Sequence, residues 1–392
     1  MLQLIEGRQG LNSQIYERKD DKSVVIKKII CLPHVRQIGL REHCALAMAN
    51  ELLKQGCTNH VARLLNAAWS DPLRIKENEL PRHIFTYESE KGMVEVRNLY
   101  LTQARADLCL EEMFKKLHFF DDALALSLFF QGIQVIVALQ SFWPGGLNHN
   151  DIYPRNVLLQ KVDKNEVFAY KYPNQTFYCR SMGYQLQLCD FGLSTCKGMY
   201  EKIHEHGIVG NKYVPPFEKK RYHEIEHLLF YGTEVDQVQR DFASWCLSWL
   251  SYDTHSRYPC ISPRMSLMIM HFLNNVLLTF KTKGSKSLES LINRIELFFQ
   301  DGIELYWMPR IIRSTVPPEK TLNEKIRASI LKLEAKHRLM HPSIKVPDHC
   351  PEVEDVWEIP QQCHVMTPVP VDNEQYTRVK VELQRIFDAI YV

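Results

Sequence analysis

The first part of the chain combines short β-branched runs with one amphipathic segment. Residues 1–35 are predicted to form strands, and Val24-Val25-Ile26 is a short β-branched run within them. Residues 39–55 predict a helix, since apolar side chains recur on one face and Gly56 follows as a stop signal. Further strand-like runs lie at 83–87 and 99–102. This part of the chain is therefore predicted to be mainly β.

From about residue 107 the apolar pattern changes to a helical period. Helices are predicted at 108–117, 121–142, 236–251, 264–281, 286–300, 320–337 and 375–390. Residues 123–143 carry no charge but include three Gln, so we expect a buried helix and no membrane span. The pattern predicts an α+β protein with a β-rich unit at 1–105, a larger helical unit at 106–315 and a C-terminal extension at 316–392.

Composition narrows the class of protein. The 392 residues are 45% apolar and 24% charged, which is typical of a globular protein. Lys and Arg (48) nearly balance Asp and Glu (46), so no nucleic-acid partner is expected. The eleven cysteines have irregular spacing and no CxxC pair, which favours reduced thiols over a disulfide frame or a zinc site. The N-terminus has too few apolar residues for a signal peptide, and the cysteine usage suits the cytoplasm or nucleus.

A polar loop follows the long apolar helix and precedes the apolar run 157–159. It contains His149, Asn150 and Asp151, and then Asn156. An acid in such a loop can accept the proton of a hydroxyl nucleophile, and an amide oxygen can hold a metal ion. The acid–amide spacing alone also fits an ordinary polar turn, so it needs a second signal.

The second signal is Asp190-Phe191-Gly192, which follows another apolar run. The interval between Asn156 and Asp190 is long enough for two strands and a polar insertion at 161–181. An apolar segment precedes each acid, and the two signals together are much stronger than either one alone.

Together these segments resemble the protein kinase family of the eukaryotic type. The H-R-D-x-x-x-x-N motif appears as His149-Asn150-Asp151 through Asn156, and D-F-G begins at Asp190. The resemblance implies a two-lobed fold, with one main helix in a small β-rich lobe and a larger helical lobe. It also implies ATP and Mg²⁺ as cofactors, Asp151 as catalytic base, and Asn156 and Asp190 as metal ligands.

The resemblance also implies a lysine that contacts the ATP phosphates and a glutamate that orients it. The run from Val24 to Lys27 resembles V-A-I-K, and Lys27 fits the register, whereas Lys28 does not. The orienting acid is Glu42 or Glu51. We favour Glu42, because it lies on the apolar face of the predicted helix.

The loop that covers the phosphates matches the family weakly. Residues 8–15 align with G-x-G-x-x-G-x-V, with Gly10 at the second glycine, Ser13 in place of the third and Ile15 at the apolar position. By this resemblance the three residues would contact the nucleotide. A loop with few glycines can still offer backbone N–H groups to phosphates.

Downstream matches extend the resemblance to about residue 310. The segment 210–218 resembles the end of the family's activation segment, with Glu218 as its acid, and Asp241 resembles the helix Asp that anchors the catalytic loop. The tail 316–392 has no match, and it could bind the kinase body or a partner.

Asn150 replaces the Arg that pairs with a phosphorylated activation segment in many kinases. Phosphate on Ser194, Thr195 or Tyr200 would then lack a partner in this loop. We therefore predict an enzyme that does not need phosphorylation of its activation segment.

Two further departures concern charge around the transferring phosphate. Tyr153 stands where Ser/Thr kinases usually place a Lys, and Arg155 stands where tyrosine kinases place an Arg, so Arg155 could supply the missing positive charge. The loop lacks the A-A-R-N sequence of tyrosine kinases, which favours serine and threonine hydroxyls of a protein substrate.

Two alternatives stay open. A pseudokinase or scaffold would use the fold for binding alone, and a small-molecule kinase would share the acid–amide loop and the metal-binding Asp. The overall drift from the family pattern resembles kinases of large DNA viruses, which would place the protein in the cytoplasm or nucleus of a host cell.

Overall fold

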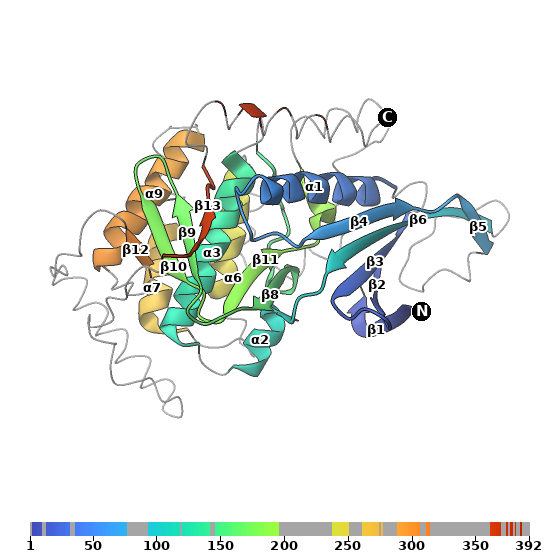
Figure 1. Ribbon diagram of the computed structural model, residues 1–392, viewed down its shortest axis with the longest axis horizontal. Helices are drawn as coiled ribbons and strands as arrows, with labels where there is room; N and C mark the ends of the chain where they lie inside the picture. Colours follow the sequence, from blue (N-terminus) through green and yellow to red (C-terminus); the bar gives the residue numbers. More distant parts are fainter. Residues whose placement is uncertain are drawn as a thin grey trace.

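The computed structural model describes most of the two expected units and part of the tail (Figure 1). The described residues are 2–9, 13–31, 36–76, 93–117, 120–141, 146–195, 237–250, 261–273, 276, 288–305, 311–313, 361–369, 374, 377, 378, 381 and 385. Helices and mostly antiparallel strands are both present. The two-lobed kinase arrangement and the boundaries at 105 and 315 stay predictions.

A six-stranded antiparallel sheet forms the N-terminal part. Its strands are β1 (Leu2–Gln9), β2 (Ser13–Arg18), β3 (Val24–Cys31), β4 (Leu64–Trp69), β5 (Leu73–Lys76) and β6 (Met93–Ala104), with the order β1-β2-β3-β6-β4 and β5 paired with the start of β6. The predicted strands at the N-terminus and at 99–102 are confirmed. The predicted strand at 83–87 lies outside the described residues.

One long helix, α1 (Arg36–Lys54), packs on this sheet. It confirms the helix predicted at 39–55, and its apolar face buries Ala45, Ala49 and Leu52. A Cβ at Gly39 would lie 2.4 Å from Cys31 Sγ, so this helix approaches β3 too closely for any larger residue there. The close approach places the first turns of α1 beside β3.

The helix α3 (Asp122–Ser141) lies at the centre of the helical part (Figure 1). Around it are arranged α2 (Leu110–Lys116), α6 (Gln237–Leu250), α7 (Pro263–His271) and α9 (Leu288–Leu305). By length and composition α3 could cross a membrane, but here nearly all its side chains are buried within the fold. The helices predicted at 121–142, 236–251 and 286–300 are confirmed. The one predicted at 320–337 lies outside the described residues, as does most of 375–390.

The prediction of a polar insertion at 161–181 was wrong. This segment forms a hairpin of β9 (Val167–Lys171) and β10 (Thr176–Arg180), flanked by β12 (Ile311–Arg313) and β13 (His364–Met366). Phe168, Tyr170, Phe177 and Cys179 are fully buried in it. In β10 buried residues alternate with half-buried ones, whereas β9 buries four residues in a row, and the charged and polar residues around the hairpin obscured both signals.

A third sheet carries the residues next to the predicted site. It contains β7 (Leu108–Cys109), β8 (Val157–Lys161) and β11 (Tyr184–Leu188), in the order β11-β8-β7. The predicted helix at 108–117 therefore begins with two strand residues. β8 and β11 are antiparallel, and Val157 lies opposite Leu188. The residues just before β8 and just after β11 are consequently neighbours.

Candidate active site

Three segments far apart in the sequence meet at Lys27. Its Nζ donates to Glu42 Oε1 at 2.7 Å and to Asp190 Oδ1 at 2.9 Å. The side chains of Lys27 and Glu42 are 10% and 3% exposed, whereas that of Asp190 is 43% exposed. We call these three residues the lysine cluster. Its closed side is formed by α1, and its open side presents the Asp190 carboxylate.

The neighbouring strand places two further predicted residues beside the cluster. Ile15 on β2 lies directly opposite Lys27 on β3, and Ser13 at the start of β2 is buried. Residues that face each other in an antiparallel pair share one side of the sheet. Gly10, predicted in the same loop, lies outside the described residues.

The charges of the cluster stabilise one another. Burial alone would lower the pKa of Lys27, but attraction to Asp190 and Glu42 raises it above its ordinary value. Burial likewise opposes ionisation of Asp190, yet the charge and hydrogen bond of Lys27 lower its pKa. Glu42 differs, because burial outweighs Lys27 and raises its pKa from 4.5 to about 7. Asp190 is thus the carboxylate that stays ionised.

Glu51, the alternative partner, is directed elsewhere. Its carboxylate pairs with Lys54 Nζ at 3.2 Å and accepts from Gln55 Nε2 at 2.8 Å. Both partners lie at the end of α1, far along the helix from Glu42. Lys28, the neighbour of Lys27, lies on the opposite side of β3 from the cluster by strand alternation.

The acid–amide loop lies on the other side of Asp190. Asn156 Nδ2 donates to Asp151 Oδ2 at 2.7 Å and to Asp151 O at 2.9 Å, so its Oδ1 is the atom that could face a cation. Asn156 closes a short 3₁₀ turn (Pro154–Asn156) just before β8. Cys189 N donates to Asn156 O at 3.0 Å, which places Asp190 next to this loop.

Asp151 is a shielded acid with one cation nearby. Burial raises the pKa of its carboxyl, while Arg155 and His149 act against this rise. Arg155 Nη2 lies 3.7 Å from Asp151 Oδ2, and its guanidinium also lies over the Tyr153 ring, 5.4 Å from the centroid. The Arg155 side chain is 56% exposed, so its charge borders the solvent side of the loop.

Asp241 anchors this loop from α6. Its Oδ2 accepts from His149 N at 2.6 Å and its Oδ1 accepts from Asn150 N at 2.8 Å. Asp241 is fully buried, and burial raises the pKa of its carboxyl despite the nearby His149. Two backbone N–H donors therefore satisfy the two oxygen atoms of the Asp241 carboxylate.

His149 connects the loop to the Asp-Phe-Gly segment, a role that the sequence motif did not specify. Its Nε2 donates to Cys189 O at 2.9 Å, and its ring packs edge-on against Phe191 with centroids 4.7 Å apart. Asp190, which stands between Cys189 and Phe191 in the sequence, adopts a left-handed backbone conformation with φ 64°. Such a conformation is uncommon for a residue other than glycine and is often found at functional sites.

Asn150 also has a left-handed backbone, with φ 63°. Its Nδ2 donates to Leu193 O at 3.0 Å and to Thr195 Oγ1 at 2.8 Å. Backbone bonds between Asn148 and Thr195 reinforce the contact. We call this set of bonds the asparagine latch. It fixes the segment after Asp190, and sequence reasoning identified Asn150 only as a missing Arg.

The residues predicted for the activation segment are only partly described by the structure. The segment 210–218 with Glu218, and Tyr200, lie outside the described residues. Ser194 is fully buried, with its Oγ donating to His149 O at 3.4 Å, and Thr195 is held by the asparagine latch.

The donor set of the site consists of oxygen atoms. Within the described part of the chain, no group of three or more His, Cys, Asp or Glu side chains is arranged around a metal position. A carboxylate from Asp190 and an amide oxygen from Asn156 suit Mg²⁺, which binds few protein ligands and keeps water or phosphate as the others. No protein-family model matches the chain, and no curated protein matches its sequence.

Proposed function

We propose that this chain is an ATP- and Mg²⁺-dependent protein kinase that transfers the γ-phosphate to serine or threonine hydroxyls. The observation that carries the proposal is Lys27 Nζ, held 2.7 Å from Glu42 and 2.9 Å from Asp190 beside the acid–amide loop. A buried lysine fixed by two distant carboxylates is what the kinase resemblance requires at the phosphates of ATP.

Each residue of the site has a chemical role in this proposal. When bound, magnesium ATP supplies the phosphoryl group and the metal charge that neutralises its oxygens. Asp190 and Asn156 Oδ1 would hold the metal, and Lys27 would contact the α- and β-phosphates. Ser13 and Ile15 would contact the nucleotide from β2, together with Gly10 by resemblance.

The acceptor side of the reaction depends on the loop. Asp151 orients the substrate hydroxyl and accepts its proton, and Asn156 keeps the Asp151 carboxylate in place through a 2.7 Å bond. Arg155 adds a cation at the solvent side of the same carboxylate. Its charge is available to the transferring phosphate, in place of the Lys that Tyr153 replaces.

A transfer assay with the full chain tests this proposal. Purified wild type is incubated with radiolabelled ATP, Mg²⁺ and a mixed protein substrate, and labelled phosphoserine and phosphothreonine are measured. Asp151→Asn should reduce transfer by about 10³-fold, because the base is lost, while nucleotide affinity measured by calorimetry stays within a few-fold. Asp71→Asn, at an exposed position in the connection between β4 and β5, is the matched control.

Other outcomes would identify the alternatives. Nucleotide binding without any transfer to proteins or small molecules would indicate a binding module of the pseudokinase kind. Transfer to sugars, choline or aminoglycosides in preference to proteins would indicate a small-molecule kinase. Full transfer by Asp151→Asn would contradict the role given to Asp151.

A further inference from the structure

The loop that follows α1 links the helix to the strand before Asp190. We call residues 55–62 the joint loop. Leu188 N donates to His60 O at 2.9 Å, and Ala62 N donates to Leu188 O at 2.8 Å. Gln185 Nε2 donates to Asn59 O at 2.6 Å. The joint loop is therefore hydrogen-bonded along β11, whose last residue lies two positions before Asp190.

A distant C-terminal segment is also hydrogen-bonded to the joint loop. Residues 361–369, which we call the strap, contain β13 and pair with β9 in parallel (Figure 1). Met366 of the strap is fully buried, and its Sδ accepts from Asn59 N at 3.2 Å. Thr367 N donates to Gly56 O at 3.0 Å. The strap thus contributes both a donor and an acceptor to the backbone of the joint loop.

The strand under the strap makes a third connection. Met366 lies beside Tyr170 in the β13–β9 register. His60 is fully buried, with Nδ1 2.9 Å from Leu186 O and Nε2 2.8 Å from the Tyr170 hydroxyl. A carbonyl can only accept, so Nδ1 donates to Leu186 and Nε2 accepts from Tyr170. Burial lowers the pKa of His60 to about 4, which keeps the ring neutral and this direction of bonding fixed at physiological pH.

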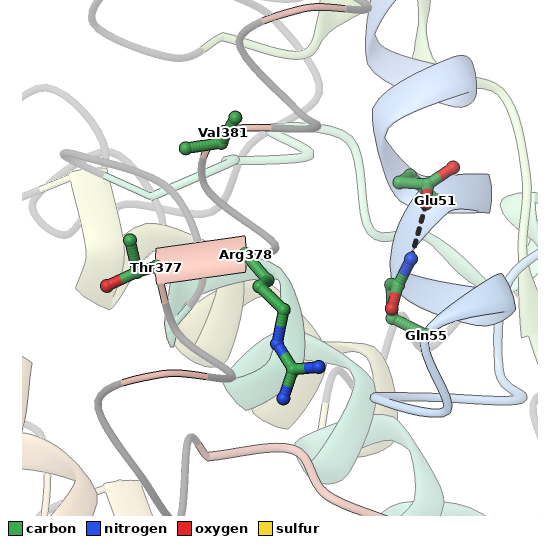
Figure 2. Close-up of a pocket in the computed structure, with 5 residues that line it drawn as sticks. All are labelled: Glu51, Gln55, Thr377, Arg378 and Val381. Atoms are coloured by element: carbon green, nitrogen blue, oxygen red, sulfur yellow. Dashed lines mark hydrogen bonds between the residues drawn. The ribbon is translucent and has the colours of Figure 1, made fainter.

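The C-terminal residues beyond the strap approach α1 as well. Thr377, Arg378 and Val381 line an open pocket together with Glu51 and Gln55 at the end of the helix (Figure 2). The end of α1 and the joint loop therefore both border the C-terminal part of the chain.

We propose that the strap is a positioning clasp for the lysine cluster. By holding the joint loop against β9 and β11, it fixes the end of α1 relative to Asp190, and thereby keeps Glu42 of α1 at Lys27. Three ties act on the loop: Thr367 to Gly56, Met366 to Asn59, and Tyr170 to His60. The consequence for catalysis rests on the proposed kinase function, whereas the clasp itself does not.

The clasp can be tested by backbone substitution in the full chain. Thr367→Pro removes the N–H that donates to Gly56, and Thr367→Val keeps it as the matched control. Residue 367 precedes Pro368, which already biases its backbone toward extended conformations, and a proline at 367 fits such a conformation. Amide hydrogen exchange of the nucleotide-free protein should accelerate by about tenfold or more at 55–62 and at the end of α1 in Thr367→Pro only, with α3 unchanged.

A second variant covers the case in which Thr367→Pro opens the whole fold. Met366→Ala removes the Sδ acceptor and the buried side chain, and it should accelerate exchange of the Asn59 amide and its neighbours. In the same variants phosphate transfer should fall by about 3- to 10-fold, as expected for coupling through a packed element. Unchanged exchange at 55–62 in both variants would overturn the clasp. Absence of transfer in wild type would instead refute the kinase function, and the exchange result would still decide on the clasp.

Discussion

Two carboxylates of the site have different partners. Asp241 binds the backbone of the loop 148–156, and Asp190 binds Lys27 in the lysine cluster. Asp241 is fully buried and is satisfied by the backbone N–H groups of His149 and Asn150. Asp190 is 43% exposed and shares the ammonium of Lys27 with Glu42. Burial raises the pKa of Asp241, whereas Lys27 lowers that of Asp190 despite the opposing effect of burial.

The difference separates a structural acid from an acid that is open to a ligand. Both oxygens of Asp241 accept hydrogen bonds from backbone N–H groups, and the residue is fully buried. These hydrogen bonds therefore stabilise the conformation of the loop. Asp190 keeps its charge and remains partly exposed, so it can bind a cation without breaking a hydrogen bond to the backbone. Substituting each acid by its amide should therefore affect different properties.

The largest effect is expected for Asp190→Asn. The substitution removes the proposed metal ligand and the partner of Lys27, and transfer should fall by about 10³-fold. Because the side chain is 43% exposed, the free energy of unfolding should change by only about 1 kcal/mol or less. Radiolabelled transfer and urea denaturation measure the two quantities. A loss of several kcal/mol in stability would show that Asp190 is structural, as Asp241 is.

Asp241→Asn should show the reverse balance. One amide N–H₂ would face the buried N–H of His149 or Asn150, which leaves a donor without an acceptor. We expect the free energy of unfolding to fall by about 2–4 kcal/mol. Urea denaturation with the same m-value would show this, and Asp71→Asn should stay within about 0.5 kcal/mol of wild type. A change no larger than that of the control would contradict the anchoring role.

The sequence predicted the parts of this site that depend on local pattern. Glu42 was favoured over Glu51 by its place on the apolar face of a helix, and Glu42 is the residue that contacts Lys27. The proximity of Asp151 and Asn156 could be predicted because both lie in one short loop. Such features need only the period of one helix or the length of one turn.

Contacts between distant segments could not be predicted in this way. Met366 and Asn59 are 307 residues apart, and nothing in either local sequence indicates their pairing. The β9–β10 hairpin was taken for a polar insertion, because its buried residues form two short runs that charged and polar residues flank and separate. Asn150 was identified by what it lacks, since the groups that it contacts follow Asp190.

The lysine cluster should also give the protein a pH-dependent stability. Folding raises the pKa of Glu42 from 4.5 to about 7, so the folded state holds this proton more tightly than the unfolded chain. The stabilisation is fully present below about pH 4.5 and is lost as the pH rises through about 7. Relative to Glu42→Gln, wild type should lose up to about 3 kcal/mol between these values, measured by urea denaturation at several pH values. A constant difference between the two proteins would contradict a raised pKa.

The smallest effect is expected at the asparagine latch, which acts on the anchored side of the site. Asn150→Gly keeps the left-handed backbone and removes only the Nδ2 bonds to Leu193 and Thr195, so we expect a loss of about 1 kcal/mol. Asn150→Ala adds the strain of a Cβ at positive φ and should cost about 1 kcal/mol more. Thermal or urea unfolding separates the two variants. Because the latch holds Thr195 without a phosphate, phosphatase treatment of wild type should leave transfer intact, and a large loss would show that a phosphate, not Asn150, fixes this segment.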